Sequence, residues 1–534
     1  MPTVNLDKKR FLKYLDRDYD DEFLKERIAM LGTDLDSITE TEIIVEAFPN
    51  RPDLLSEAGM ARALRGFIGI ETGLPAYDIK KGNWKVSVDH KVKKIREHAV
   101  CAVAKNVNID SAYLKSLMQI QEKLHVTHSR NRKMASIGMY DLDTIKFPIK
   151  YTTVQHDFKF TPLEATKEMT VKQILKEHPK GKDYAHLLVG DEYPMWIDAQ
   201  GQVLSMPPII NSAETAITEK TKNLFIDVTG LDGKVVDQAM SIIVALLHDH
   251  GATIEQVNIN GAITPNMAPW EMKFDYKYIN KFLGLDLTDK EIKKHLERMR
   301  IGVRGDMAVV PAYRTDILHP RDLMEEVAIS YGYENFEAEI PNVSTVGEEQ
   351  PATVFQRKLA EACVGLGLLE CLSFHLSNEG VLIEKMDREP RPLLKVTNPV
   401  NKDYDTIRDL LMPGLLKVLS ENKHHELPQK LFEQGTVVDE KMNEVTSLAI
   451  VSSHANAGYD EARSMVEAIF RSLGKPVAFT QDTKPYFMPG RTAQIAYQGE
   501  HIGYCGEIHP KVLNNFGLEN PAIGIEFNVD RLLK

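Results

Sequence analysis

The chain is poor in cysteine, in long apolar runs and in excess positive charge. Its 534 residues include four cysteines, and no two of them have the Cys-x-x-Cys spacing. This usage argues against a disulfide framework or a zinc site and predicts buried thiols in a reducing compartment. The longest apolar run, residues 239–247, is too short to span a bilayer, and the first residues contain no apolar signal core. We therefore expect a cytoplasmic protein.

The charge balance limits the partners that the chain can bind. A net charge of -12 and a pI near 5.8 exclude a protein that holds nucleic acid through its overall charge, so any nucleic acid must meet local basic patches. The length and the 43% hydrophobic content predict about three or four domains, each with its own core.

A helix expected to begin at Pro320 is rich in carboxylates. Asp322, Glu325 and Glu326 are spaced i, i+3 and i+4, so they project from one face of the first turns, and Asp316 lies just upstream. Four oxygen donors without cysteine or histidine suit a hard divalent cation, and Mg²⁺ is the best candidate. The alternative is that these acids only complement the positive end of the helix.

An internal repeat favours the cation. The aligned pairs are Arg51 with Arg314, Asp53 with Asp316, Leu55 with Leu318, Gly69 with Gly332 and Glu71 with Glu334. The two segments look like one supersecondary unit used twice. Where the later copy has its three helix acids, the earlier copy has Gly59, Arg62 and Ala63, so the fold itself does not need the acids. Like charges on one turn are unfavourable unless a cation lies among them, and we expect a bound cation or a cationic partner.

The fold class that we expect is a multidomain chain of α/β and α+β type with four segments. These are residues 1–85 (a helix and strand unit, repeat copy one), 86–262 (mixed α/β), 263–342 (repeat copy two) and 343–534 (an α/β domain on an antiparallel sheet). A linker rich in proline and polar residues, 341–351, lies at the start of the last segment. In copy two, Thr288 and Glu291 have the spacing of a capping box, and in copy one Pro52 is expected to open a helix.

Four motifs in order along the chain carry a resemblance to a known family. They occupy residues 50–56, 206–212, 225–230 and 314–333. With them the chain resembles the beta subunit of phenylalanyl-tRNA synthetase of the archaeal and eukaryotic type. The resemblance implies a tetramer of two alpha and two beta chains that attaches phenylalanine to tRNA-Phe with ATP, which the alpha subunit binds. It also implies that the beta chain binds Mg²⁺ next to the alpha chain through Asp316, Asp322, Glu325 and Glu326.

The resemblance makes residues 86–262 a tRNA-editing-type domain and residues 343–534 a class II synthetase catalytic-like domain. A class II active site needs an arginine that holds the ATP phosphates. The nearest candidates are Arg408, which precedes Asp409, and Arg531, which ends a segment that lacks the glycine-rich run leading into Glu-Arg. We therefore expect an inactive domain that packs on the alpha chain.

The family's proofreading pocket falls in the editing-type segment. A pocket shaped for phenylalanine cannot strongly exclude tyrosine, so a second, hydrolytic site that recognises the phenol is expected. No Ser-His-Asp or Cys-His set is apparent, which favours a water positioned by hydrogen bonds over a covalent intermediate. The alternative is that residues 211–212 and 227–230 are ordinary turn and cap residues. The resemblance places the polar positions of the pocket at Ser205, Asn211, Asp227 and Thr229, with Trp196 as a candidate wall.

Two other segments have weaker signals. His125 and His128 lack the further ligands of a zinc site, so we expect surface or helix-end histidines. The basic loop with Arg130, Arg132 and Lys133 either meets tRNA phosphate or is a solvated loop. Three functions stay open: a ligase beta subunit that also removes tyrosine from mischarged tRNA-Phe, a non-catalytic scaffold that binds RNA or a partner, and a stand-alone metal-dependent hydrolase.

Overall fold

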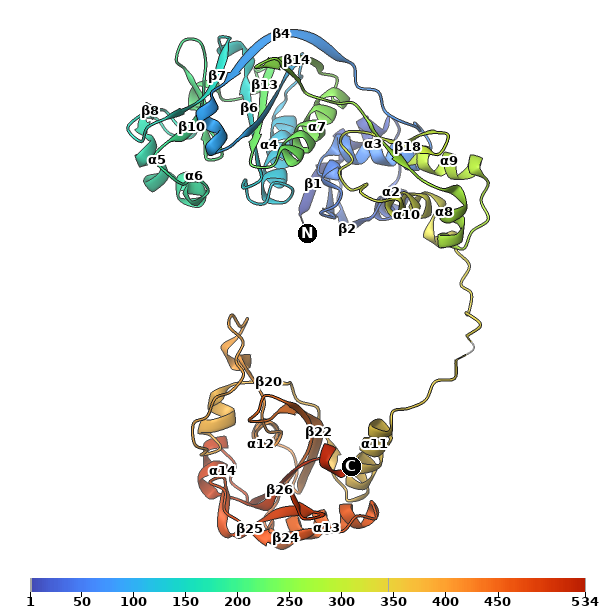
Figure 1. Cartoon of the computed structure of the whole chain (residues 1–534), viewed down its shortest axis with the longest axis vertical. Coiled ribbons are helices and arrows are strands. Elements are labelled where there is room, and N and C mark those ends of the chain that lie inside the picture. Colours follow the sequence, from blue (N-terminus) through green and yellow to red (C-terminus); the bar gives the residue numbers. More distant parts are fainter. Residues whose placement is uncertain (1, 344, 534) are drawn as a thin grey trace. The chain divides into compact units, whose positions relative to one another are not determined.

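The computed structural model describes residues 2–343 and 345–533, which form two compact units: unit 1, Met1–Glu339, and unit 2, Ile340–Lys534 (Figure 1). The predicted linker, 341–351, contains no helix or strand at residues 341–343 and 345–350, and its last residue, Pro351, begins α11. Among the residues described, no helix has both the length and the apolar character needed to cross a membrane.

Unit 1 uses one order of elements twice. The first set is β1 (Thr3–Asp7), α1 (Lys8–Leu15), α2 (Asp21–Ala29), β2 (Thr33–Ile38), β3 (Glu42–Ala47) and α3 (Glu57–Phe67). The second set is β16 (Trp270–Lys273), α8 (Tyr276–Leu283), α9 (Asp289–Arg298), β17 (Gly302–Arg304), β18 (Met307–Val310) and α10 (Pro320–Tyr331). Each set forms a three-stranded antiparallel sheet with its third strand in the middle, β1-β3-β2 and β16-β18-β17. The shared order supports the predicted duplication.

The starts of the helices in the two copies test the sequence signals. Thr288 and Glu291 form the predicted capping box at the start of α9, and Pro320 is the first residue of α10, so both predictions are confirmed. The prediction for Pro52 is wrong, because residues 52–54 form only a 3-10 turn. Helix α3 begins after Ser56, whose side chain accepts a hydrogen bond from the Gly59 amide at 3.2 Å. A serine hydroxyl satisfies a free amide at the helix start, which a proline cannot do.

The middle of unit 1 is one mixed sheet of ten strands with the order β12-β11-β10-β7-β4-β14-β5-β13-β6 and β15 beside β14. The strands are β4 (Ile79–Val88), β5 (His98–Lys105), β6 (Ala135–Asp141), β7 (Ile149–Val154), β10 (Tyr193–Ile197), β11 (Val203–Met206), β12 (Ile210–Asn211), β13 (Leu224–Gly230), β14 (Thr253–Ile259) and β15 (Ala262–Thr264). The helices of this part are α4 (Ser111–Val126), α5 (Val171–Glu177), α6 (Pro179–Tyr184) and α7 (Gly233–Asp249), and β8 (Lys159–Phe160) pairs with β9 (Met169–Thr170).

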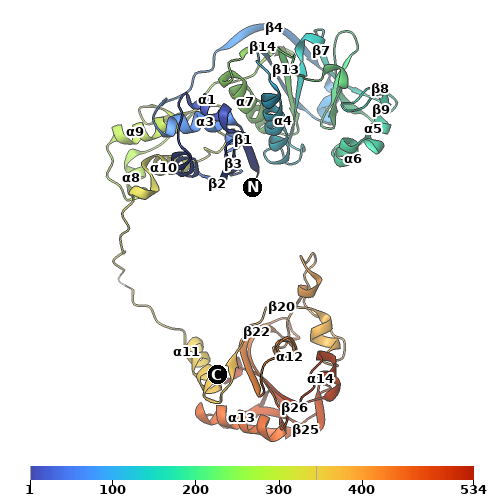
Figure 2. The ribbon, with the colours of Figure 1, turned by 180° about the vertical axis from the view of Figure 1, so that it is seen from behind.

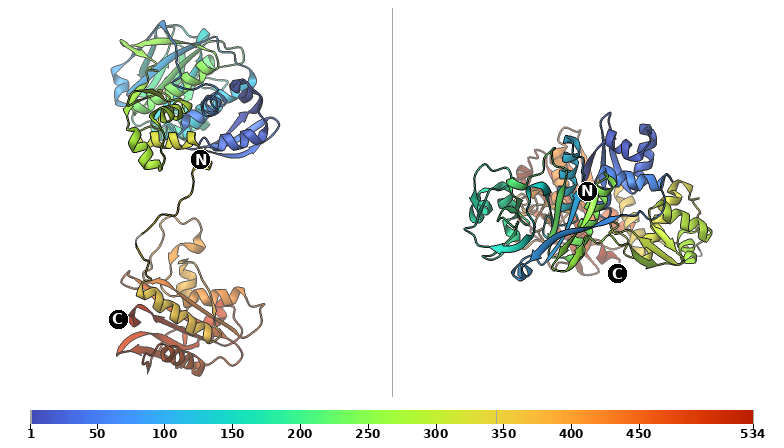
Figure 3. Two further views of the ribbon diagram at one scale, coloured as in Figure 1. Left: turned by 90° about the vertical axis from the view of Figure 1, so that its right-hand side faces the viewer. Right: turned by 90° about the horizontal axis from the view of Figure 1, so that it is seen from above.

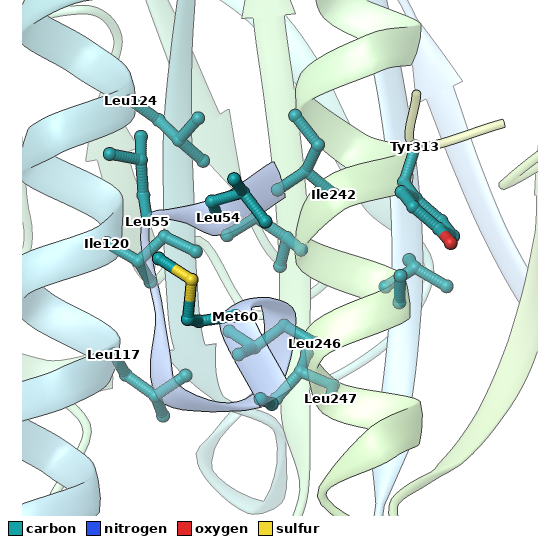
Figure 4. Packing of buried hydrophobic residues seen from close by; sticks show 14 of the residues in the cluster. Leu54, Leu55, Met60, Leu117, Ile120, Leu124, Ile242, Leu246, Leu247 and Tyr313 are labelled. Carbon is teal, nitrogen blue, oxygen red and sulfur yellow. The ribbon is translucent and has the colours of Figure 1, made fainter. Parts of the chain in front are cut away.

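The two faces of this sheet carry separate cores. On β13, Ile226 and Val228 pack in the core under α4 and α7, whereas Phe225 packs in a second core on the opposite face. Side chains alternate along a strand, so Asp227 and Thr229 share the face of Phe225. Figure 4 shows side chains of α4 and α7 facing one another, with residues of the first repeat copy between them: Leu117, Ile120 and Leu124 of α4, Ile242, Leu246 and Leu247 of α7, and Leu54, Leu55 and Met60.

The sheet curls until its two ends meet. The side-chain amide of Asn211, on the end strand β12, donates to the Met139 carbonyl on the opposite end strand β6, at 3.4 Å. Close by, the hydroxyls of Tyr140 on β6 and Ser205 on β11 lie 2.7 Å apart. This seam brings together residues that are far apart in the sequence.

Unit 2 is a seven-stranded sheet with helices on both faces (Figures 2 and 3). Its order is β19 (Leu369–Glu370), β22 (Gln429–Val438), β23 (Glu444–Ser453), β27 (Ala522–Asn528), β26 (Glu500–Ile508), β25 (Phe487–Tyr497) and β24 (Ala478–Gln481). Within this sheet, only β19 and β22 are parallel among the described strand pairs. Helices α11 (Pro351–Gly365) and α13 (Tyr459–Ser472) share one core with the sheet, and α12 (Met412–Glu421) and α14 (Pro510–Phe516) share the other. A two-stranded ladder joins β20 (Leu376–Ser377) to β21 (Thr406–Ile407).

The mixed α/β, multidomain fold class is therefore confirmed in its coarse form. The division into four domains at 1–85, 86–262, 263–342 and 343–534 stays a prediction.

Candidate functional site

A cavity of about 400 Å³ opens at the seam of the curled sheet. Strands β6, β11, β12 and β13 and helix α4 contribute to its wall, which is mainly apolar. The polar side chains that its strands contribute are Ser136, Tyr140, Ser205, Asn211 and Asp227. It is also lined by Gln121, Glu122, His125, Arg132, Glu164 and Lys180. A concave site with mostly apolar walls and convergent polar groups is the usual form of a small-molecule pocket.

Asp227 forms a buried polar group at this cavity. Its carboxylate is 1% exposed and accepts a hydrogen bond from the Tyr140 hydroxyl at 2.5 Å. Burial raises the pKa of Asp227 to about 7, because a charged carboxylate loses its water. Burial also raises the pKa of Tyr140 well above its ordinary value, so this phenol stays protonated at neutral pH.

The predicted pocket residues divide into two groups. Ser205, Asn211 and Asp227 line the same cavity. Thr229 does not line it, and its hydroxyl lies 3.1 Å from the hydroxyl of Ser136, which does. Trp196 is also absent from the cavity wall, since it is fully buried and stacks on Tyr151. The catalytic roles of the four predicted residues stay predictions.

The alternative of ordinary turn residues holds at one of the two positions. Ser212 does cap a 3-10 turn, because its hydroxyl accepts from the Glu214 amide. Residues 227–230 belong to the buried strand β13 and not to a turn. A buried aspartate within a strand therefore needs another explanation than turn formation.

A buried arginine supports the loop beside the cavity. Arg96 donates to the carbonyls of Thr229 at 2.8 Å and Arg132 at 3.1 Å, and burial lowers its pKa to about 10. The loop contains three successive residues with positive φ, Arg130 (48°), Asn131 (53°) and Arg132 (64°). Non-glycine residues rarely adopt this region, so the loop needs such outside support.

At the rim of the cavity, Arg132 connects three segments. Its guanidinium donates to Glu122 on α4 at 2.9 Å and to the Ile209 carbonyl at 3.0 Å, and it lies over the Tyr184 ring of α6. Of the two alternatives for this loop, the solvated one does not hold for Arg132, which is only 9% exposed.

His125 is buried beside this ion pair and lies in the last turn of α4, so of the two expected places, the surface and a helix end, it has the second. Its Nε2 accepts from the Ile137 amide at 2.8 Å, which leaves the proton on Nδ1, facing Glu122 at 3.4 Å. The hydrogen bond from His125 and the charge of Arg132 lower the pKa of Glu122 to about 2, and burial lowers that of His125 to about 4. At neutral pH Glu122 is therefore ionised and His125 is neutral.

The carboxylates predicted to bind Mg²⁺ do not converge. The Arg314 guanidinium pairs with both Asp316 (2.7 Å) and Glu326 (2.7 Å), and all three side chains are buried. Asp322 accepts the Leu318 and His319 amides at 2.6 and 2.7 Å. The fourth, Glu325, is exposed and accepts from the Tyr333 hydroxyl at 2.6 Å.

This arrangement does not fit an ion shared by all four carboxylates. Over residues 2–343 and 345–533, no three His, Cys, Asp or Glu side chains are grouped so that they could hold a metal ion. The sequence predicted that a cation lies among these like charges. The structure has a cation of the same chain there, because the Arg314 guanidinium neutralises Asp316 and Glu326. Magnesium binding itself stays a prediction.

In unit 2, the candidate phosphate-binding arginine is used internally. Arg408 is 4% exposed and donates to Glu433 at 2.5 Å and to the Thr436 carbonyl at 3.0 Å. Glu526 accepts the amides of Leu411 and Met412 at the start of α12, at 2.8 and 2.9 Å, and burial raises its pKa to about 7. These groups hold the helix and the strands together.

Comparison with known proteins covers nearly the whole chain. Four family models match: the Phe-tRNA synthetase beta subunit B1 domain (1–70), the B3/4 domain (92–244), the tRNA synthetase B5 domain (272–333) and the phenylalanyl tRNA synthetase beta chain CLM domain (337–529). The phenylalanine--tRNA ligase beta subunit of Archaeoglobus fulgidus is 42% identical over 99% of this chain and 98% of its own length. That of Methanosarcina barkeri is 40% identical over 96% of each chain.

The chain belongs to the phenylalanine--tRNA ligase beta-subunit family. The family prediction is thus confirmed, and with it the class of aminoacyl-tRNA synthetase subunits. An N-terminal fragment of the phenylalanyl-tRNA synthetase beta subunit from Pyrococcus horikoshii has a similar structure, with a TM-score of 0.61 and 38% identity, covering 62% of this chain and all of the fragment.

Within this family framework, the cavity falls in the B3/4 match and α10 falls in the B5 match. Sequence reasoning missed Tyr140 and the cavity roles of Glu122, His125 and Arg132. One local signal existed for Tyr140. A Cβ added at Gly138 would lie 2.0 Å from the Tyr140 hydroxyl and 2.2 Å from the Asp227 carboxylate, so glycine there marks a close approach.

Proposed function

We propose that this chain is the beta subunit of a ligase that attaches phenylalanine to tRNA-Phe with ATP, and that its own cavity hydrolyses tyrosine from mischarged tRNA-Phe. The observation that carries the second part is the buried polar group Ser205–Tyr140–Asp227 in a cavity with mostly apolar walls. The family membership carries the first part.

The chemistry of the polar group suits a second sieve. Tyrosine and phenylalanine differ by one hydroxyl, and a hydrophobic pocket separates such a pair by only about a hundredfold. A buried polar group that is completed by a phenol and left unsatisfied by a phenyl ring discriminates in the opposite direction. Ser205 and Asp227 are candidates for this contact, and Asn211 at the seam can hold the aminoacyl group or a water.

Hydrolysis at this site would use water as the nucleophile. The water oxygen attacks the ester carbonyl, the bond to the ribose oxygen breaks, and that oxygen leaves with a proton. The Cys101 thiol lies nearby in the inner core, but burial raises its pKa well above the ordinary value, which makes it a poor nucleophile. Glu122, ionised and half-exposed at the rim, can pair with the ammonium group of the aminoacyl ester.

Unit 2 is proposed as an inactive class II synthetase catalytic-like domain that packs on the alpha subunit. The internal use of Arg408 supports this, because an arginine paired with a buried glutamate is not free to hold ATP phosphates. The complete ligase is then an alpha2-beta2 tetramer in the cytoplasm, in which the alpha subunit binds ATP. Co-expression with an alpha chain should give a stable complex with phenylalanine-dependent charging, whereas pure beta chain should show no phenylalanine-dependent ATP turnover.

A magnesium site at α10 is a separate proposal with a narrower donor set than the sequence suggested. Asp322 and Glu325 are the two carboxylates that Arg314 does not neutralise. We propose that they contribute to a Mg²⁺ site whose remaining oxygen ligands come from water and from the alpha chain. Mg²⁺ would supply positive charge between the subunits.

Incubation of the full chain with tyrosyl-tRNA-Phe tests the editing proposal. Release of tyrosine, reduced at least tenfold (about 1.4 kcal/mol of barrier) by Asn211→Ala, is the expected result. Asn514→Ala is a matched control, because Asn514 is an exposed residue of α14 in unit 2. No release by the folded chain would leave the scaffold function as the better description. Release that requires Mg²⁺ and is lost in Glu325→Ala would favour the metal-dependent hydrolase.

A further inference from the structure

Tyr140 joins the cavity to the buried carboxylate. Its hydroxyl oxygen lies 2.5 Å from Asp227 Oδ2 and 2.7 Å from Ser205 Oγ. Both partners were predicted pocket residues, whereas Tyr140 was not. The three groups come from strands β13, β6 and β11, so the chain of hydrogen bonds crosses the seam of the curled sheet.

The direction of these hydrogen bonds follows from the number of protons. Above pH 7, near the pKa of Asp227, its carboxylate is ionised and only accepts, and a phenol has a single proton, so Tyr140 donates to Asp227. The Tyr140 oxygen must then accept the proton of Ser205. With its proton committed to Tyr140, Ser205 has only oxygen lone pairs left for the cavity.

Packing holds this chain of hydrogen bonds, from Ser205 through Tyr140 to Asp227, in place, and we call it the relay. The Tyr140 ring is 1% exposed and stacks on Phe225, with ring centres 5.9 Å apart. The absence of a side chain at Gly138 leaves the space that the Tyr140 hydroxyl and the Asp227 carboxylate occupy. Packing of the ring therefore fixes the Tyr140 oxygen between Asp227 and Ser205, and the ionised Asp227 sets the direction of the two hydrogen bonds.

We infer that Tyr140 is a positioning residue that makes Ser205 a hydrogen-bond acceptor toward the cavity, and that the cavity therefore selects aryl groups whose para substituent donates a hydrogen bond. The inference deepens the editing function proposed above and relies on it for the identity of the natural substrate. A tyrosyl phenol is such a donor, and a phenylalanyl ring is not.

The test compares a donor with an acceptor of similar size. Binding of p-toluidine and of 4-fluorotoluene to the full chain is measured by ligand-observed NMR at about pH 8, above the pKa of about 7 of Asp227. In parallel, tRNA-Phe acylated chemically with tyrosine, 4-aminophenylalanine or 4-fluorophenylalanine is tested for hydrolysis. The variants are Tyr140→Phe, which removes only the hydroxyl, and Ser205→Ala, which removes the acceptor itself.

Tyr113→Phe is the matched control. Tyr113 is also a fully buried tyrosine of unit 1, but it lies in the other core, and its hydroxyl has no hydrogen-bond partner among the described residues. Tryptophan fluorescence shows whether each variant is folded.

The wild-type chain should prefer the donor probe, and in Tyr140→Phe this preference should fall about tenfold, equivalent to about 1.4 kcal/mol. Ser205→Ala should lose the preference in the same way, and Tyr113→Phe should keep it. A purely structural role for Tyr140 would weaken both probes equally and leave their ratio unchanged, which would overturn the inference.

The two arms separate this inference from the proposed function. If no aminoacyl ester is hydrolysed, but the donor preference is present and falls in Tyr140→Phe, the relay stands and the editing function is wrong. Equal binding of the two probes to the wild-type chain overturns the relay even if tyrosine is released. A preference for the donor probe that survives in both Tyr140→Phe and Ser205→Ala also overturns the relay.

Discussion

Unit 1 buries carboxylates in two different ways. Where the two repeat copies meet, Asp53 pairs with Arg51, and Asp316 pairs with Arg314 through two hydrogen bonds each. In the cavity, Asp227 accepts instead from a hydroxyl. Burial raises the pKa of both Asp316 and Asp227, but the Arg314 charge outweighs it and holds the pKa of Asp316 below its ordinary value, whereas that of Asp227 is about 7.

The two kinds of buried carboxylate suit different roles. A carboxylate paired with a guanidinium stays ionised near neutral pH and holds the fold, whereas a carboxylate that is buried without such a partner can change its protonation or its hydrogen bonds there. The later repeat copy has Glu326 where the earlier has Ala63, and Arg314 accommodates this extra acid. Extra acids in one copy are therefore not by themselves a sign of a metal.

Replacing the central arginine should have the largest effect. Arg314→Met leaves Asp316 and Glu326 buried without a cation, and breaking a buried pair in this way costs about 3–5 kcal/mol. The matched variant Arg51→Met strands only Asp53 and should cost less. Urea unfolding followed by tryptophan fluorescence measures unit 1 alone, because Trp84, Trp196 and Trp270 all lie in it. Equal costs for the two variants would contradict the comparison.

The second prediction uses pH to separate Asp227 from the paired carboxylates. The folded-state pKa of about 7 is above the unfolded value near 3.8, so the folded state binds the extra proton between these values. The contribution of Asp227 to the free energy of unfolding should fall by roughly 4 kcal/mol as the pH rises through this window. Asp227→Asn should remove this slope, because the amide does not titrate.

Asp316 changes the free energy of unfolding with pH in the opposite direction and over another pH range. Its lowered pKa stabilises the fold above its ordinary value near 3.8, and this contribution is lost only as the pH falls further. Asp316→Asn should therefore leave the slope between pH 4 and 7 intact, which makes it the control. A slope that is unchanged in Asp227→Asn would show that Asp227 is not the titrating group.

A smaller effect is expected when the later copy is made like the earlier one. Glu326→Ala places alanine where copy one has Ala63 and leaves Arg314 paired with Asp316. The loss of one charged hydrogen-bonding group should cost about 2 kcal/mol in the same unfolding measurement. Glu325→Ala, in the same helix but exposed, should stay within about 0.5 kcal/mol of the wild type. If both variants cost the same, burial beside Arg314 has no special importance.

Local signals in the sequence predicted local structure. The capping box of α9, the proline at the start of α10 and the same order of elements in the two copies depend on neighbouring residues or on a repeated pattern. The gathering of Ser205, Asn211 and Asp227 around one cavity was reached through the family resemblance. The partners of these groups were not predicted.

The missing partners share a physical cause. Tyr140 reaches Ser205 and Asp227 across 65 and 87 residues of sequence, and only the closure of the curled sheet brings them together. Arg314 precedes Glu326 by 12 residues, a separation with no periodic meaning, so its pairing depends on how the loop before α10 folds back. The clustered acids of α10 predicted a nearby cation, but they did not show that this cation is Arg314.

Magnesium should have the smallest effect on the chain alone. Asp316 and Glu326 are already neutralised by Arg314, and only Asp322 and Glu325 remain for an ion, which is too few ligands for tight binding. A site with a Kd of about 0.1 mM would add about 2.7 kcal/mol to the free energy of unfolding at about 10 mM Mg²⁺. We expect no measurable difference between Mg²⁺ and EDTA for the isolated chain, and a stabilisation that disappears in Glu325→Gln would mean that the carboxylates rearrange around the ion without a partner.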